Sequence, residues 1–365
     1  DGTTREDLQN PPIGRTAYGS GPFILKEWLP QARTVYERNP DYFKQGLPYL
    51  DEVVIHFAGD TAAVMSAFIT GRSDFYGSLR RPGLTYYPDL DRLKAEGKID
   101  SATHPAGNRP NGIFMNNSKP PFDDVNIRKA AFLAVDRTEW CELAWDNACT
   151  TALLFSSGEG NWGRPEEEIW NVVPGWGTGA KKQQEIEEAK ALLAANGYPD
   201  GIELEQLNLM GRGILGRFAE IAQAQLARAG INSTMNVQNI TEGYSRFAKL
   251  DYLFLASWFS QVTFDPSEAI GNTWITGGAR NWIGYYNPEV DRLFPLMDAE
   301  VDPAKRRQLV QQIEDIVILQ DFAHVVMPDT ATEHFWWKRL HNAGLFGISP
   351  GYGSGFHRQE DLWLE

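Results

Sequence analysis

One passage in the middle of the chain, residues 111–137, constrains the fold more than any other. It reads as a strand, a proline-rich hinge and a helix in direct succession, because an apolar run ends at two prolines, aspartates suited to a helix start follow, and apolar residues one helical turn apart come next. These features are residues 113–115, Pro120 and Pro121, Asp123 and Asp124, and Ile127, Ala131 and Ala134. Asp136 with Glu139 resembles a capping box and predicts the start of a second helix. We therefore expect the border between two lobes here.

After the hinge, stretches with strand and helix periodicity alternate. The predicted strands are 202–209, 231–237 and 252–256, and the predicted helices are 186–197, 215–230 and 244–248. This order is typical of right-handed α/β crossovers, so a mixed sheet with helices on its faces is expected. An amphipathic helix at 302–320 and a buried strand at 323–327 complete this lobe.

The part before the hinge supplies only half of an α/β lobe. Its predicted elements are strands at 34–37 and 53–57, a helix that begins at Asp60-Thr61 and a short helix at 90–95. The predicted domains are therefore residues 1–111 for the remainder of a first lobe, 112–328 for a second α/β lobe, and 329–365 for a return to the first.

The composition is that of a globular protein that binds no nucleic acid. With 365 residues, 42% of them hydrophobic, the chain can bury a sizeable core and form about two domains. No run approaches the roughly eighteen uninterrupted apolar residues of a membrane span. The net charge is -14, from 34 basic and 48 acidic residues. Nucleic-acid binding draws on clustered Lys and Arg, which this balance argues against.

The only two cysteines, Cys141 and Cys149, allow two interpretations. In a continuous helix their Cα atoms would lie roughly 12 Å apart, beyond the ~4.4–6.8 Å that a disulfide allows. A bridge therefore requires the helix to end near Asp146 and Asn147. A disulfide, which export from the cytoplasm would favour, and two separate buried thiols both remain open. A metal site lacks further ligands nearby.

A first group of candidate binding residues follows the predicted strand 252–256. In open α/β sheets, ligands gather beyond the carboxyl ends of the strands. The residues at this end are Trp258, Phe259, Ser260 and Gln261. The tryptophan ring offers a flat surface for a sugar ring, a peptide plane or a cation. Alternatively, it fills the core beneath the loop.

A second candidate patch interleaves aromatic and amide groups between residues 272 and 286. Such a surface can stack on a polar solute and hydrogen-bond to it. The candidate contacts are Trp274, Arg280, Asn281 and Tyr285. The alternative is a glycine-bounded strand with Trp282 and Tyr286 in the core.

Motifs for catalysis are not found in the sequence. The six histidines show no HExxH or paired ligand spacing, and neither a Gly-x-Ser-x-Gly elbow nor a Walker loop occurs. We therefore expect a binding protein with no enzymatic activity, cofactor or metal. A hydrolase acting through two carboxylates is the alternative. A third possibility is a structural remnant that binds nothing alone.

Six pieces of sequence, in order, resemble the large extracytoplasmic solute-binding proteins of ABC importers, the dipeptide- and oligopeptide-binding family 5. They are residues 19–23 with 38–43, 71–74, 120–130 with 134–137, 189–201, Trp258 with Asp265-Pro266, and 286–291. The resemblance runs from about Pro11 to Trp363 and implies a fold like that of type II periplasmic binding proteins, with two mixed-sheet lobes joined by a two-crossover hinge. Members of the family are longer at the N-terminus, so we expect the N-terminal part of the first lobe to be missing here.

The resemblance also implies a function. Such a chain, acting as a monomer, captures a solute in the cleft between its lobes by hinge closure and delivers it to the membrane permease of an ABC transporter. Its location would be the periplasm or the extracellular face of a bacterial membrane. The resemblance places Asn111, at the hinge floor, and Arg280, Asn281 and Tyr285 near the ligand.

The class of solute is predicted from one departure from the family pattern. Peptide-binding members typically carry an aspartate a few residues after the tryptophan that matches Trp258, where it pairs with the peptide α-amino group. Here Gln261 and Val262 stand at those positions, and no acid occurs before Asp265. An oligosaccharide is therefore favoured over a peptide-like solute, although Asp265 could take the role. Opines also remain open.

Overall fold

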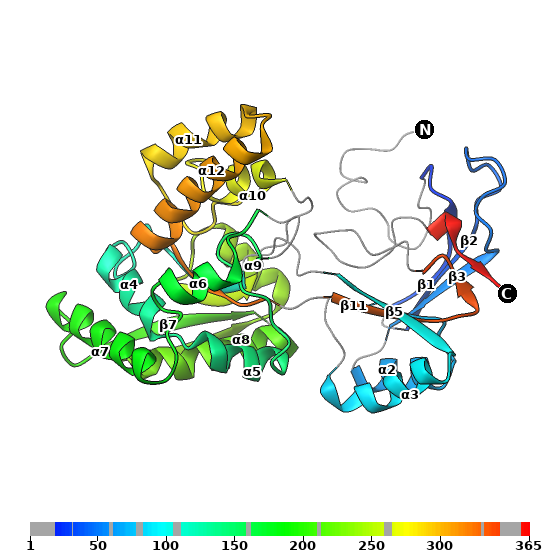
Figure 1. Ribbon diagram of the computed structural model, residues 1–365, viewed down its shortest axis with the longest axis horizontal. Helices are drawn as coiled ribbons and strands as arrows, with labels where there is room; N and C mark the ends of the chain where they lie inside the picture. Colours follow the sequence, from blue (N-terminus) through cyan, green and yellow to red (C-terminus); the bar gives the residue numbers. More distant parts are fainter. Residues whose placement is uncertain are drawn as a thin grey trace. The chain divides into compact units, whose positions relative to one another are not determined.

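The computed structural model describes residues 19–30, 32–57, 61–77, 83–104, 111–157, 162–209, 213–258, 265–329, 332–343 and 359–365. These residues fall into two compact units (Figure 1). The first unit contains the described residues up to His104 and from Thr332 onward, and the second contains those from 111 to 329. The sequence placed these borders at residues 111 and 328.

Within its described residues, the first unit contains small antiparallel sheets and two α-helices. Its sheets are β1 (Phe23–Leu29), β2 (Arg33–Arg38) and β3 (Glu52–His56); β4 (Phe75–Tyr76), β11 (Thr332–Trp337) and β5 (Ile99–His104), in that order; and β12 (Leu340–His341) with β13 (Trp363–Leu364). Helices α2 (Thr61–Ile69) and α3 (Tyr87–Ala95) accompany the second sheet. Its core includes Met65, Phe68, Leu90 and Phe335.

The second unit is built on a mixed sheet, as the sequence predicted, and in the described residues this sheet has five strands. The strands, in spatial order, are β10 (His324–Met327), β6 (Asn111–Met115), β9 (Phe254–Trp258), β7 (Ile202–Leu209) and β8 (Ile231–Gln238). β7 runs parallel to β8 and β9, whereas β6 runs antiparallel to β9 and β10. The carboxyl ends of β7, β8, β9 and β10 therefore share one edge of the sheet with the first residue of β6.

Helices cover both faces of this sheet (Figure 1). The described helices of the unit are α4 (Val125–Ala134), α5 (Arg137–Trp145), α6 (Glu166–Val172), α7 (Gly179–Ala195), α8 (Gly213–Ala227), α9 (Ile240–Ala248), α10 (Pro266–Thr273), α11 (Pro288–Ala299) and α12 (Pro303–Glu314). Of these, α10, α11 and α12 form a group of their own, in which α11 packs on both α10 and α12 (Figure 1). Gln206 of β7 donates to the Ala219 carbonyl of α8 over 2.9 Å. On the opposite face, Gly243 of α9 lies against Leu209 so closely that an added Cβ would be 2.3 Å from a methyl group.

The predicted helix starts are confirmed. The Asp124 carboxylate accepts from the amide of Asn126 over 2.7 Å at the start of α4, and that of Asp136 accepts from the amides of Thr138 and Glu139 over 2.9 and 3.0 Å at the start of α5. The predicted helix at 302–320 changes geometry, because residues 315–320 form a π-helix. There Ile316, Val317 and Ile318 are buried in succession, which one face of an α-helix cannot provide.

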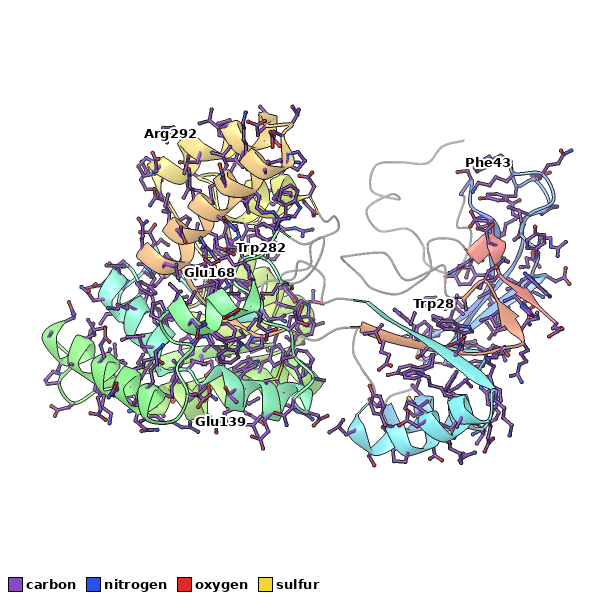
Figure 2. The ribbon with its side chains drawn as sticks, in the orientation of Figure 1. Trp28, Phe43, Glu139, Glu168, Trp282 and Arg292 are labelled. Atoms are coloured by element: carbon purple, nitrogen blue, oxygen red, sulfur yellow. A yellow bond between two sulfur atoms is a disulfide. The ribbon has the colours of Figure 1, made fainter. Side chains whose placement is uncertain are left out.

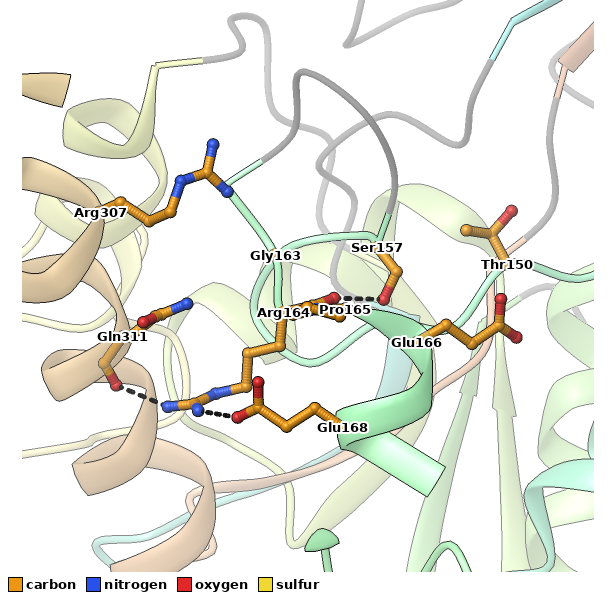
Figure 3. Close-up of a pocket in the computed structure, with 9 residues that line it drawn as sticks. All are labelled: Thr150, Ser157, Gly163, Arg164, Pro165, Glu166, Glu168, Arg307 and Gln311. Atoms are coloured by element: carbon orange, nitrogen blue, oxygen red, sulfur yellow. Dashed lines mark hydrogen bonds and ion pairs between the residues drawn. The ribbon is translucent and has the colours of Figure 1, made fainter. Parts of the chain in front are cut away.

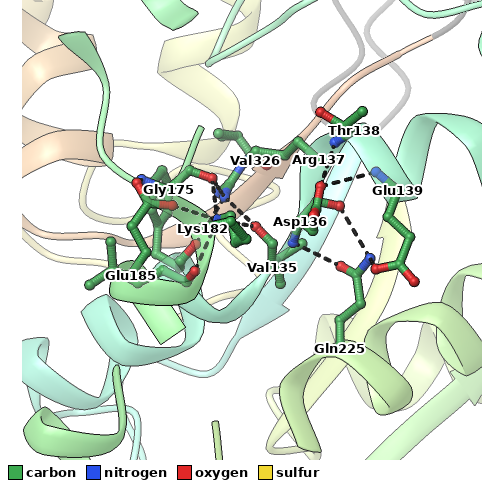
Figure 4. A network of polar contacts seen from close by, with 12 residues as sticks. Val135, Asp136, Arg137, Thr138, Glu139, Gly175, Lys182, Glu185, Gln225 and Val326 are labelled. Atoms are coloured by element: carbon green, nitrogen blue, oxygen red, sulfur yellow. Dashed lines mark hydrogen bonds and ion pairs between the residues drawn. The ribbon is translucent and has the colours of Figure 1, made fainter. Parts of the chain in front are cut away.

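A buried cationic network holds α4, α5 and α7 together (Figure 4). The Lys182 ammonium donates to the carbonyls of Leu133, Val135 and Gly175 and lies 2.6 Å from the Glu185 carboxylate. Arg137, only 1% exposed, donates to the carbonyl of Val326 in β10 and to that of Gly175. Burial, and then the nearby Arg137 charge, lowers the pKa of Lys182 to about 8. Burial likewise lowers the pKa of Arg137 to about 9. The network therefore secures the helices that pack beneath the sheet.

Candidate functional site

Strand register brings residues from three strands together at the carboxyl-end edge of the five-stranded sheet. Asn111, the first residue of β6, lies opposite Trp258 on β9 and opposite Met327 on β10. Gly112 permits this close pairing, because an added Cβ there would lie 2.2 Å from the Val325 carbonyl oxygen. This edge, defined by Asn111, Trp258 and Met327, is the candidate solute site, and we call it the sheet-edge site.

Asn111 has an unsatisfied donor at this edge. Its side chain is only 3% exposed, and its Nδ2 has no hydrogen-bond partner in the part of the chain that the structure describes. A buried amide without a partner costs stability, so such groups are retained mainly where a water or a ligand completes them. Asn111 therefore has a donor left for a solute, and its role in binding stays a prediction.

The strand that contains Trp258 ends two residues later than the sequence predicted. The strand was expected to end at Ala256 and to leave the tryptophan on a loop, but β9 continues to Trp258 because its backbone pairs with Asn111. The ring is half-buried and meets Phe218 edge-on at 5.9 Å between ring centres. One side of the ring therefore packs on the core while part of the side chain stays exposed, and the predicted contact with a solute stays a prediction.

The three other predicted residues at this edge, Phe259, Ser260 and Gln261, lie outside the described residues.

Two aromatic residues of the second predicted patch are core residues. Trp274 is 1% exposed and stacks on His324 at 4.9 Å, and Tyr285 is 4% exposed and donates its hydroxyl to Asp321 over 2.6 Å. Burial, and then the Asp321 carboxylate, raises the pKa of Tyr285. The second candidate patch is therefore corrected at these two residues, because neither ring presents a face on which a solute could stack.

Asn281 and Arg280 belong to a compact loop and not to the alternative strand. The Asn281 amide donates to the carbonyls of Ile275 and Tyr285 over 3.0 and 2.7 Å and accepts from the Tyr285 amide over 2.9 Å. These bonds direct the Asn281 side chain into its own loop. Arg280 is half-buried, and its backbone amide donates to Asn272. Trp282, labelled in Figure 2, packs on Phe247 at 5.4 Å.

Asp265, the alternative partner for a peptide amino group, is already bound within the protein. Its carboxylate takes both arms of the Arg306 guanidinium, at 3.0 and 2.7 Å, and accepts from the amide of Ser267 at the start of α10. Partial burial acts to raise the pKa of Asp265, but these donors outweigh it and lower the pKa. An incoming ammonium group would have to displace an arginine here.

His324 is a buried residue near the site that the sequence analysis did not single out. It is fully buried between Phe114, at 5.1 Å, and Trp274, and neither ring nitrogen has a hydrogen-bond partner among the described residues. Burial, and then the Arg137 charge, lowers the pKa of His324 to about 3, so the ring is neutral at physiological pH. The one sequence signal for this residue is that the histidine begins an apolar run, residues 324–327.

Cys141 and Cys149 form a disulfide in the structure, with their Cα atoms 5.9 Å apart. Helix α5 ends at Trp145, and Asp146 adopts a left-handed conformation at its C-cap, as a bridge over this spacing requires. The next residue after the bridge, Thr150, exchanges two backbone hydrogen bonds with Asp329, of 2.6 and 3.0 Å. Trp145 donates its indole N–H to the Pro328 carbonyl over 3.2 Å. The bridge thus lies beside the chain that leaves β10.

Comparisons with known proteins identify the family. Residues 3–281 match the model of bacterial extracellular solute-binding proteins, family 5 middle region. A probable di/tripeptide-binding protein 5 of Pseudomonas aeruginosa is 24% identical over 326 residues, covering 86% of this chain and 56% of that protein. The heme-binding protein A of Haemophilus influenzae is 25% identical over 362 residues, covering 94% and 57%.

Solved structures show the same fold. The periplasmic binding protein AgaA of A. tumefaciens, in complex with agropinic acid, has a TM-score of 0.78 at 21% identity, covering 99% of this chain and 70% of that chain. The oligopeptide-binding protein AppA of Bacillus subtilis, in complex with a nonapeptide, has a TM-score of 0.75 at 22% identity, covering 98% and 69%. The fold predicted from the sequence is therefore confirmed.

The chain belongs to the bacterial extracellular solute-binding proteins of family 5. It spans 56 to 57% of the length of the two relatives above. Within the described ranges, every helix is too short or too polar to cross a membrane.

Proposed function

We propose that this chain is the solute-binding component of an ABC importer, acting at the periplasmic or extracellular face of a bacterial membrane. The observation that carries the proposal is the sheet-edge site. A buried amide with an unpartnered donor and a half-buried tryptophan lie opposite each other there, at the edge where open α/β sheets collect ligands. The family to which the chain belongs, which is defined by solute binding, supports the same reading. The alternative of a hydrolase has no comparable support.

Among the described residues, the chain passes from one unit to the other at two places, which are relevant to the mechanism. One precedes Asn111 at the start of β6, and the other follows Asp329, just beyond the end of β10, the strand next to β6. A solute held at the sheet-edge site is therefore near both passages. We expect binding to shift the equilibrium between arrangements of the two units, through the solute's different affinity for each.

The class of solute is less constrained than the site. The burial of Trp274 and Tyr285 weakens the argument for an oligosaccharide, and the occupation of Asp265 weakens that for a peptide held as in other members. We propose a polar solute that Asn111 hydrogen-bonds and on which Trp258 stacks. We further expect a monomer that works with permease subunits and without a cofactor.

A thermal-shift screen of the purified protein tests this proposal. The solutes are short peptides, oligosaccharides, opines and glutathione, each at a high concentration. A solute present at ~100 times its Kd stabilises the native state by about 2.7 kcal/mol, which raises the melting midpoint measurably. Trp258→Ala should abolish the shift for the solute that binds. The proposal is contradicted if no class shifts the midpoint, or if the shift is the same in the variant.

A further inference from the structure

Two polar side chains of the five-stranded sheet are buried and have no role in the solute site. Ser257 of β9 and His324 of β10 are both 0% exposed. Neither the Ser257 hydroxyl nor either ring nitrogen of His324 has a hydrogen-bond partner among the described residues. Nearly all buried polar groups in proteins are hydrogen-bonded, to protein atoms or to ordered water, so these two side chains require a partner.

Two cations of the second unit show the more usual arrangement, in which the protein itself supplies the partners. Arg164, in the wall of a cavity beside α6, donates to the Glu168 carboxylate and to the Gln311 carbonyl (Figure 3). Lys182 donates to three backbone carbonyls (Figure 4). The surroundings of His324 are different, because its ring lies between two aromatic rings that stack on it.

Strand register places Ser257 and His324 on the same face of the sheet. Gly112 of β6 lies directly opposite Ser257 on one side and opposite Val326 on the other. Paired residues of antiparallel strands point to the same face, and so does His324, which precedes Val326 by two residues. The residues of the sheet-edge site are one position away along each strand and therefore belong to the opposite face.

Gly112 allows the His324 ring to approach Ser257. The imidazole leans over this glycine, because a Cβ added there would lie 2.9 Å from the His324 Cδ2. Nε2 is bonded to Cδ2, so it is the ring nitrogen on the side of Gly112. Ser257 is one strand spacing, about 4.8 Å, beyond Gly112. A separation of about 5 Å corresponds to two hydrogen bonds that meet at one water molecule.

The chemistry of the two side chains suits water better than an ion. Burial, and then the Arg137 charge, lowers the pKa of His324 to about 3, so the ring is neutral. A neutral imidazole has one donor and one acceptor nitrogen, and a serine hydroxyl can donate and accept. Water can therefore bond to both in either tautomer. An ion would lose its hydration here and gain no opposite charge from Ser257 or His324.

We propose that an ordered water molecule bridges the Ser257 hydroxyl and the His324 Nε2 across Gly112. Buried waters typically make two to four hydrogen bonds to groups that the protein leaves unsatisfied. The bridge links β9, β6 and β10, the three strands whose end residues form the sheet-edge site. It supports the register of these strands from the face that the solute does not contact, and it would be present even if the chain bound no solute.

A high-resolution crystal structure of the wild type tests the water site directly. We expect one water molecule at about 2.7–3.2 Å from both the Ser257 Oγ and the His324 Nε2. A direct hydrogen bond between the hydroxyl and the imidazole would overturn the proposal. So would a position without water, or other protein groups that bond to both side chains.

Nitrogen NMR of the His324 side chain gives a second readout, in solution. Ser257→Ala removes one partner of the bridging water, so the Nε2 resonance should shift. Val326→Ala is the matched control, because Val326 is buried on the other side of Gly112 and has no polar side-chain group. The Nε2 resonance of the control should stay close to that of the wild type. Equal shifts in the two variants would count against the bridge.

Denaturant unfolding of single and double variants measures the energetic link between the two side chains. Ser257→Ala and His324→Phe each leave the other group buried without its bridge, whereas the double variant removes both groups. The unfolding constant of the double variant should therefore lie at least about fivefold below the product of the two single effects. Effects that simply multiply would overturn the proposal. If a single variant does not fold, the crystal structure of the wild type decides.

Discussion

Removal of the Cys141–Cys149 disulfide should lower the free energy of unfolding of the second unit by about 2.5 kcal/mol. The bridge closes a loop over a sequence separation of 8 residues. In the chain-entropy model a loop of this length removes roughly 8 cal/mol/K from the entropy of the unfolded chain, or about 2.5 kcal/mol at 25 °C. The effect should be confined to stability, because removal of the bridge leaves the backbone pairing of Thr150 and Asp329 in place.

The assay is denaturant unfolding of the wild type with and without a reductant, alongside the double variant Cys141→Ala/Cys149→Ala. Reduction should lower the denaturant midpoint of the wild type. The double variant should unfold near the midpoint of the reduced wild type, and its own midpoint should not change when the reductant is added. Equal midpoints for the oxidised and reduced wild type would refute the entropic reasoning. Two titratable thiols in the untreated native protein would instead support the alternative of separate buried cysteines.

Three further changes give distinct readouts. His324→Leu should reduce the acid sensitivity of folding: burial lowers the native pKa of His324 to about 3, so the unfolded state binds the extra proton and the wild type loses about 2 kcal/mol between pH 6.5 and 4.5. Unfolding titrations at both pH values should show a smaller loss in the variant; equal losses would contradict the assignment. Glu314→Gln should instead reduce the loss of stability at rising pH, because burial raises the native pKa of Glu314 to about 7. The stability of the protonated form is lost as pH rises through 7, by about 2 kcal/mol between pH 5 and 8, and that decline should vanish in the variant. Trp274→Ala should cost about 3–5 kcal/mol of stability, whereas Trp258→Ala should mainly raise the solute Kd, measured by calorimetry; the reverse pattern would exchange their roles.

Local patterns predicted the elements that depend on neighbouring residues. Asp124 and Asp136 cap α4 and α5 because a side chain two residues before an amide reaches it whatever the rest of the fold does. The alternation of strands and helices between residues 186 and 256 likewise predicted the mixed sheet, because the periodicity of buried residues is a property of each segment alone.

Contacts between distant segments decided the candidate site. Trp274 and Tyr285 looked like a binding surface, but His324 and Asp321 bury them, and both of these come from the region after α12. Asp265 was the alternative partner for an amino group, but Arg306, which lies 41 residues further along the chain, donates to its carboxylate.

The sequence by itself determined the family and the class of fold, because motif order and hydrophobic periodicity are written along the chain. The edge of the sheet where a solute would bind stays a prediction. Only the tertiary structure decided which residues at that edge remain able to bind. Strand register sets Asn111 opposite Trp258, and the pairing of Thr150 with Asp329 brings the segment after the disulfide beside the end of β10. Neither pairing could be predicted from the sequence, because register and burial depend on partners more than a hundred residues away.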